Sequence, residues 1–276
     1  MKDLLLFLSP ASGDLLPAGA HYGLALARAH GAGLSALIAE IEPLNVLPEP
    51  DNMQADDAAV EPASLTERRA RTAELVLSAA NSANVPCEIL GAGGGYLNIR
   101  ERVISSAQVR DVLIVDLYGP LQSSRKDLVD GALFGSGRPV ILVPQCARDL
   151  AAHRIAIAWD ATRSAVRAVH DALPLLTRAH DVTVVSVVDD KTLSMPGTGD
   201  ALCRYLERWD VAAKFSAIDR GHLDIGKALL SYARRTNADL LVMGGFAHGF
   251  ERELMLGSAT RDIYRTSVDI PVFLSH

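Results

Sequence analysis

The sequence is poor in aromatic residues, which make up 5% of its 276 residues, and it has only three cysteines. Cys87, Cys146 and Cys203 lie far apart and form no CxxC pair or metal-ligand spacing, so we predict neither a disulfide framework nor a zinc site. Scattered cysteines of this kind fit a reducing cytoplasm. Because 49% of the residues are hydrophobic, the chain can still bury a large core, which excludes global disorder.

Long hydrophobic runs and an excess of positive charge are also missing. The apolar run near the start lies within residues 4–9, and no stretch approaches 18 residues, so we expect no signal sequence and no membrane span. A net charge of −6 argues against a protein that grips nucleic acid by neutralising phosphates. Residues 1–150 hold 18 acidic and 12 basic residues, whereas the remainder hold 15 of each. We therefore predict a soluble cytoplasmic protein that binds neither membrane nor nucleic acid.

Short apolar runs alternate with helical patterns along the whole chain. The runs typical of buried strands lie at residues 4–9, 34–40, 87–90, 111–116 and 139–143, and again at 154–159, 182–188, 212–218, 239–243 and 271–274. Continuous apolar strands separated by helices indicate parallel sheets covered on both faces. Each half of the chain is therefore predicted to be a five-stranded, doubly wound α/β domain.

The two halves also resemble each other as an internal repeat of roughly 140 residues. The segment Asp111-Val-Leu-Ile-Val matches Asp239-Leu-Leu-Val-Met, and residues 137–142 match residues 269–274. We predict domains at residues 1–145 and 154–276, joined by a linker at 146–153.

A glycine-rich segment of the second half offers the clearest candidate site. Ligands of doubly wound sheets bind beyond the carboxyl ends of the strands, and residues 239–243 run directly into Gly244 and Gly245. These glycines could let backbone amides approach an anion, and the Gly257-Ser258 pair could complete a phosphate cradle. The alternative is that the glycines only permit tight strand-to-helix packing. Neither a Walker A motif nor a GxGxxG fingerprint is present.

This segment resembles a known family motif. Gly244-x2-Ala247-x9-Gly257-Ser258 is similar to the Gly-x2-Gly-x9-Gly-Ser/Thr motif of the universal stress protein family, and the resemblance covers the chain as two tandem copies. It is strongest over residues 154–276. The resemblance implies an adenine nucleotide α-hydrolase-like fold with strand order 3-2-1-4-5. It also implies that the closing strands of the two domains pair with each other, and that the motif binds the phosphates and ribose of ATP.

The resemblance also implies a set of nucleotide-binding residues. These are Asp160, Val187, Gly244, Ala247, His248, Gly257, Ser258 and Ala259. Ala247 stands where the family has glycine, and an alanine is strained there if the position needs a positive φ. The expected ligand is ATP or a related nucleotide, with Mg²⁺ as an optional companion. No catalytic residue and no protein-built metal site is predicted.

The first half departs from the motif at the corresponding positions. Asp116 falls where the second half has Gly244, Ser9 falls where it has Asp160, and no Gly-Ser pair follows at the required spacing. A carboxylate at Asp116 would repel a triphosphate. We therefore expect a degenerate first domain and a nucleotide in the second domain alone.

Taken with this resemblance, the sequence predicts a tandem universal stress protein that acts as a nucleotide-responsive binding or regulatory module and forms a homodimer, and it predicts no enzyme. Two alternatives stay open at this point. One is a module of the same fold that works through protein contacts without nucleotide. The other, less favoured, is a weak ATP hydrolase.

Overall fold

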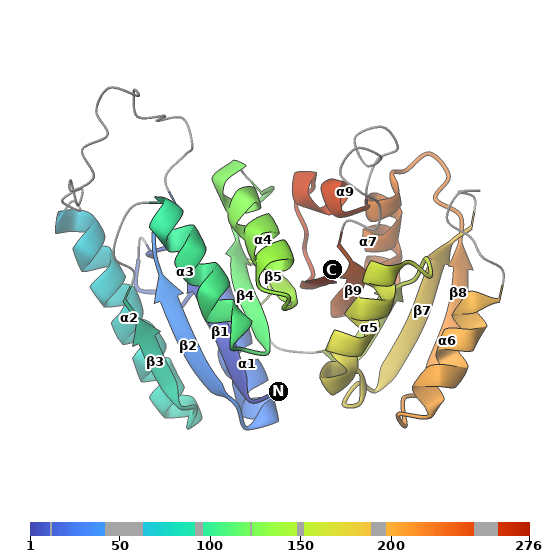
Figure 1. Ribbon diagram of the computed structural model, residues 1–276, viewed down its shortest axis with the longest axis horizontal. Coiled ribbons are helices and arrows are strands. Elements are labelled where there is room, and N and C mark those ends of the chain that lie inside the picture. The colour runs from blue at the N-terminus through green and yellow to red at the C-terminus, as the bar shows by residue number, and fades with distance from the viewer. Residues whose placement is uncertain are drawn as a thin grey trace. The chain divides into compact units, whose positions relative to one another are not determined.

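The computed structural model describes residues 1–11, 13–41, 63–91, 96–121, 123–147, 152–188, 197–245 and 259–276 (Figure 1). The chain divides into two compact units. The first unit comprises Met1–Asp116 and Leu121–Arg138, and the second comprises Leu117–Pro120 and Pro139–His276.

The first unit has the expected alternation of strands and helices. Its elements are β1 (Asp3–Leu8), α1 (Ala18–His30), β2 (Gly33–Ile38), α2 (Ala63–Ala83), β3 (Cys87–Leu90), α3 (Tyr96–Gln108), β4 (Val112–Leu117) and α4 (Ser123–Gly135). The strands lie in the order β3-β2-β1-β4, and all the pairs are parallel. Gly31 ends α1 in the left-handed conformation, at φ 59°, which glycine adopts without steric cost.

The second unit repeats this plan and adds one strand. Its elements are β5 (Val140–Pro144), β6 (Arg154–Ala158), α5 (Arg163–Leu176), β7 (Asp181–Val187), α6 (Thr198–Glu207), β8 (Ala213–Ile218), α7 (Ile225–Arg235), β9 (Leu240–Gly244), α9 (Ala259–Arg265) and β10 (Val272–Ser275). The strand order β8-β7-β6-β9-β10 is the predicted 3-2-1-4-5 arrangement. α5 and α6 cover one face of this sheet, and α7 and α9 lie on the other (Figure 1).

The two closing strands pair with each other, as the resemblance implied. β5 lies antiparallel to β10, with Ile141 opposite Phe273. Through this pairing, β5 belongs to the second unit. The pairing also covers the edge of β10, which would otherwise present unpaired backbone groups.

The internal repeat extends to the register of the central strands. Leu4 of β1 pairs with Val112 of β4, and Ile155 of β6 pairs with Leu240 of β9. At the amino ends, the Asp111 carboxylate accepts hydrogen bonds from the first residues of β1, and the Asp239 carboxylate accepts them from the residues that begin β6. The positions that are equivalent in the two units of the structure are therefore the ones that the sequence repeat aligned.

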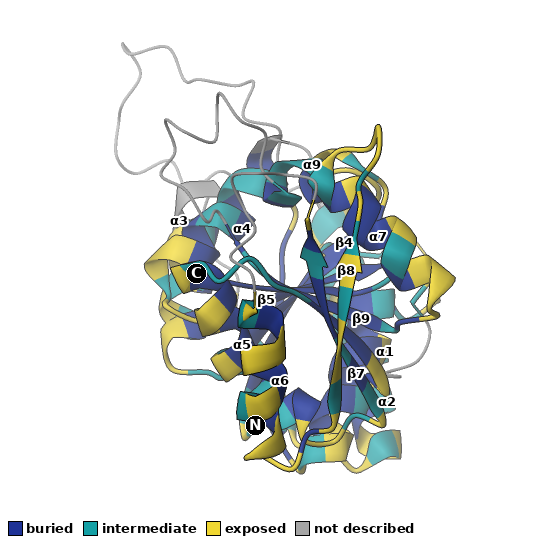
Figure 2. Ribbon diagram, turned by 90° about the vertical axis from the view of Figure 1, so that its right-hand side faces the viewer, coloured by how far each residue is buried: buried dark blue, intermediate teal, exposed yellow. Residues whose placement is uncertain are grey.

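Buried strands form the core of each unit (Figure 2). Leu4 to Leu8 of β1 and Val112 to Val115 of β4 are fully buried, as continuous apolar strands between two helical layers should be. β8 differs, since none of its residues is buried and Phe215 is 38% exposed. This strand lies at the edge of the sheet, so one side of it has no neighbouring strand to cover it.

The sequence pattern predicts helices over residues 100–109, 201–210 and 251–265, and the structure differs from these ranges. α3 begins at Tyr96 rather than at residue 100, and α6 runs from Thr198 to Glu207 rather than over residues 201–210. Of the helix expected over residues 251–265, the described part is α9, Ala259–Arg265. Within the described residues, no helix is both long enough and apolar enough to cross a membrane.

Candidate functional site

Three of the predicted site residues gather at the carboxyl edge of the second unit. Asp160 follows β6, Val187 ends β7 and Gly244 ends β9. β6 lies between the other two strands, and its Ile157 pairs with Val184 of β7 and Val242 of β9. Continuing that register places Asp160 level with Val187 on one side and one residue beyond Gly244 on the other. Sheet topology therefore brings together residues separated by more than 80 positions in sequence.

Asp160 is held in a tight turn that leads into α5. Its carboxylate accepts hydrogen bonds from the Thr162 backbone N–H, at 3.0 Å, and from the Thr162 hydroxyl, at 2.6 Å. Thr162 is the N-cap of α5, and its hydroxyl oxygen accepts from the Ala165 N–H. Between them, Ala161 has a positive φ of 60°. This conformation is unfavourable for any residue that has a side chain. The chain thus tolerates strain where it turns from β6 into the helix.

The start of α5 has the character of an anion-binding site. Backbone N–H groups at a helix N-terminus carry partial positive charge and attract anions. The first turn of α5 contains no acidic residue, and its first residue is the exposed Arg163. The Ser164 hydroxyl lies 3.3 Å from that of Thr162, which adds hydroxyl groups beside the amides.

Gly244 lies directly against this helix start. A Cβ atom at Gly244 would lie 2.6 Å from the backbone of Ser164 and Ala165, and 2.6 Å from the Ser164 hydroxyl oxygen. Real Cβ atoms essentially never come within 3.0 Å of such neighbours, so only glycine fits here. The sequence left open whether Gly244 serves an anion or only permits tight packing of strand and helix. The structure shows the tight packing.

The next glycine uses its backbone groups within the protein. The Gly245 N–H donates to the Ser275 carbonyl at 2.7 Å, and the Gly245 carbonyl lies 2.9 Å from Nδ1 of His276. The Gly245 amide is thus part of the ladder between β9 and β10. The interpretation that both glycine amides face an anion is wrong for Gly245.

Ala259 begins α9 and packs against the start of α7. A Cβ atom at Gly226 would lie 2.6 Å from the Ala259 carbonyl oxygen, so this helix start also needs glycine. Nearby, the Asp262 carboxylate accepts from the Gly226 N–H at 3.0 Å. Burial raises the pKa of the Asp262 carboxyl, against the lowering effect of that hydrogen bond. The remaining predicted site residues, Ala247, His248, Gly257 and Ser258, lie outside the described residues.

Sequence reasoning missed the residues that shape this turn. Thr162 and Ser164 were not proposed as site residues, yet they line the helix start against which Gly244 packs. The signal was present, because a threonine two residues after Asp160 and directly before a helical pattern is a typical N-cap. In the part of the chain that the structure describes, no group of three or more His, Cys, Asp and Glu side chains could hold a metal ion.

The corresponding edge of the first unit is built differently. The Asp116 carboxylate, 1% exposed, accepts a hydrogen bond of 2.5 Å from the Gly19 N–H, in the first turn of α1. The Arg125 guanidinium donates to the Asp116 carbonyl and, at 2.5 Å, to the Ser9 hydroxyl. Here a carboxylate of the chain itself occupies the helix N-terminus.

The fold defines the class: doubly wound α/β domains, in which ligands bind beyond the carboxyl ends of the strands. Residues 152–275 match the sequence model of the universal stress protein family. The second half of the chain is therefore a domain of that family.

Solved structures extend the likeness in fold to the whole chain. A universal stress protein from Archaeoglobus fulgidus is 16% identical, with 99% of this chain and 95% of that chain covered and a TM-score of 0.68. A protein named as a universal stress protein from Pseudomonas aeruginosa is 14% identical, with 99% and 92% covered and a TM-score of 0.56. No curated protein matches the chain significantly.

Proposed function

We propose that the second unit binds ATP or a related nucleotide at its carboxyl edge and that the protein works as a binding or regulatory module. The start of α5 is the observation that carries the proposal. Its amides, two hydroxyl groups and Arg163 lie next to Asp160, with no acidic residue in the first turn. Such a helix start favours a phosphate group.

The packing of Gly244 supports the same proposal. Because the start of α5 packs directly onto Gly244, the Asp160 turn that precedes the helix is held at the carboxyl edge of the sheet. Val187 ends β7 at the same edge, where the resemblance implies that its backbone contacts the base. Family membership of residues 152–275 agrees with a nucleotide ligand.

Isothermal titration calorimetry with ATP, with and without Mg²⁺, tests this proposal. We expect one ATP per chain. Arg163→Glu should weaken ATP binding at least tenfold, because it puts a negative charge at the helix start that holds the phosphates. The matched control is Arg178→Glu, the same change at an exposed position beyond the other end of α5, and it should change the affinity less than twofold.

The outcomes separate the alternatives. An absence of heat at millimolar ATP would contradict nucleotide binding and favour a module that works through protein contacts alone. Steady release of phosphate that is lost in Asp160→Asn would favour an ATP hydrolase. We further propose a cytoplasmic homodimer, and light scattering that gives about one chain mass of 29.5 kDa would contradict the dimer.

A further inference from the structure

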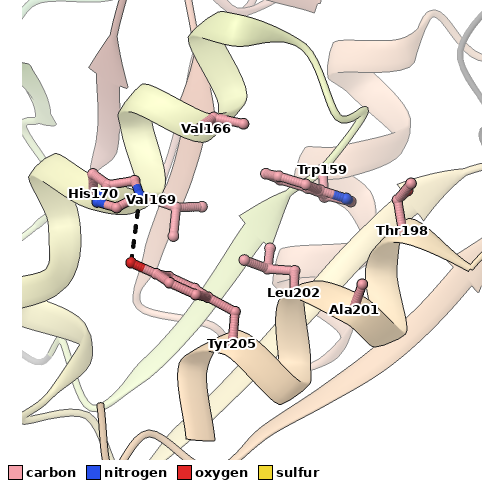
Figure 3. Close-up of a pocket in the computed structure, with 8 residues that line it drawn as sticks. All are labelled: Trp159, Val166, Val169, His170, Thr198, Ala201, Leu202 and Tyr205. Atoms are coloured by element: carbon pink, nitrogen blue, oxygen red, sulfur yellow. Dashed lines mark hydrogen bonds between the residues drawn. The ribbon is translucent and has the colours of Figure 1, made fainter. Parts of the chain in front are cut away.

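The second unit contains a cavity of about 340 Å³ between α5 and α6. Its lining residues come from both helices and from the residue after β6: Trp159, Val166, Val169, His170, Thr198, Ala201, Leu202 and Tyr205. Figure 3 shows side chains of α5 and α6 facing each other across this space, with the Trp159 ring between the two helices. None of these residues belongs to the proposed nucleotide site.

The described lining is mostly apolar, with His170, Thr198 and Tyr205 as its more polar side chains. Val169 and Leu202 are buried, while Val166 and Ala201 form the open side. At one end, the Tyr205 hydroxyl lies 3.4 Å from Nε2 of His170 (Figure 3). Among the described lining residues there is no Asp, Glu, Lys or Arg, so a charged ligand would lose its hydration without gaining an ionic partner from them.

Trp159 adds one unsatisfied polar group. Its indole N–H is buried and has no hydrogen-bond partner among the residues that the structure describes, and the nitrogen lies on the Thr198 side of the ring (Figure 3). Buried polar groups are nearly always hydrogen-bonded, because an unpaired one costs free energy. Because the nitrogen has almost no exposed surface, a ligand in the cavity meets the ring rather than this N–H.

We propose that this cavity, which we call the α5–α6 pocket, binds a small neutral molecule that is mostly apolar and carries one hydroxyl or carbonyl oxygen. The volume is at the lower end of the range of about 300–1,000 Å³ for small-molecule sites. It suits about ten heavy atoms, since a water molecule takes up about 30 Å³ of the liquid. The ligand chain packs between Val169 and Leu202, and its oxygen lies at the end of the cavity where the Tyr205 hydroxyl can pair with it.

Fluorescence titration with 1-octanol, in the absence of nucleotide, tests this proposal. The chain has two tryptophans, and Trp209→Phe leaves Trp159 as the only one. We expect a saturable change in Trp159 emission with one 1-octanol per chain, checked by calorimetry. Octanoate, which has the same chain length and a charged head, should bind at least tenfold more weakly.

A matched pair of leucine substitutions locates the site. Ala201→Leu should weaken 1-octanol binding at least tenfold, because the added side chain fills the cavity. Ala70→Leu is the same change on α2 of the first unit and should leave binding unchanged. Both alanines are exposed on helices, so both variants keep the fold. Three results would overturn the proposal: no saturable signal up to the solubility of 1-octanol, equal binding of octanoate, or binding that Ala201→Leu does not weaken.

Discussion

The carboxyl edges of the two units share a backbone plan and differ in what lies at the helix start. In both units the first strand pairs with the fourth in the same register, so Asp116 and Gly244 are equivalent positions. In the first unit, the Asp116 side chain fills the space and bonds α1 through the Gly19 N–H. In the second, Gly244 has no side chain and α5 packs onto its backbone.

The turns before these helices differ as well. Four residues separate β6 from α5, and the hydrogen bonds between Asp160 and Thr162 close that turn. Nine residues separate β1 from α1, and Ser9 there bonds Arg125 instead. The comparison teaches that a duplicated fold can keep its strand register while its two copies close the helix start differently. One uses a carboxylate from a distant strand, and the other uses the hydroxyl of its own N-cap residue.

The electrostatic consequence of this difference is large enough to decide occupancy. A carboxylate about 4 Å from a phosphate oxygen costs roughly 4 kcal/mol at an effective dielectric constant near 20. That corresponds to close to a thousandfold in affinity. We expect the proposed nucleotide in the second unit alone, because the Asp116 side chain fills the space at the start of α1 and the first half also lacks the Gly-Ser pair.

The largest expected effect comes from giving Gly244 a side chain. Gly244→Ala puts a methyl group 2.6 Å from the backbone of α5, and overpacking of this kind costs about 3 kcal/mol. Chemical denaturation of the variant should show that loss in the free energy of unfolding. Gly33→Ala is the control, because a Cβ there meets nothing closer than 4.0 Å. Equal stability of the two variants would refute the close approach of α5.

Removing the carboxylate of the first unit should have the next largest effect. Asp116→Ala leaves the buried Gly19 N–H without its acceptor, which should cost about 2 kcal/mol in the free energy of unfolding. Asp116→Asn keeps an acceptor oxygen and should cost less than half as much. Neither Asp116→Ala nor Asp116→Gly should raise the ATP stoichiometry, since the Gly-Ser pair is also missing. Two ATP per chain in Asp116→Gly would show that the carboxylate alone closes this edge.

A smaller effect should follow from relaxing the turn of the second unit. Ala161→Gly removes the side chain from a residue at φ 60° and should stabilise the protein by about 0.5–1 kcal/mol, after the entropy that glycine loses on folding. Ala201→Gly, on the exposed side of α6, should instead destabilise it by about 1 kcal/mol. Thermal unfolding of both variants measures the contrast. A loss of stability in Ala161→Gly would argue against strain at this turn.

The smallest effect concerns the aspartates that both units keep at the amino edge. Burial raises the pKa of the Asp239 carboxyl above 3.8, so the folded protein holds this proton more strongly than the unfolded chain does. The stability that results is fully present below pH 3.8 and is lost as the pH rises through the folded pKa. Asp239→Asn removes this loss while keeping an acceptor for Arg154. The variant should therefore gain stability relative to the parent between pH 4 and pH 7, and a constant difference in unfolding free energy would contradict the raised pKa.

Much of the fold could be predicted because its signal is local. Continuous apolar runs predicted the strands, and the alternation of strands with helices predicted the parallel order. The same patterns gave only approximate helix ends at α3 and α6, since the first and last turns of a helix depend on neighbours that no local pattern contains. For the site, the motif and its register located Asp160, Val187 and Gly244 at one edge.

The sequence by itself thus determined the duplicated α/β plan, the aligned positions of Asp116 and Gly244, and the asymmetry of charge between the halves. Only the tertiary structure decided what those residues touch. The Asp116 carboxylate meets Gly19 across 97 positions of sequence, Gly244 receives the helix that begins at Arg163, and side chains of α5 and α6 enclose the α5–α6 pocket. The physical reason is that hydrophobic periodicity reports which side of an element is buried, whereas the atoms that meet there are fixed by how the crossover helices pack onto the sheet.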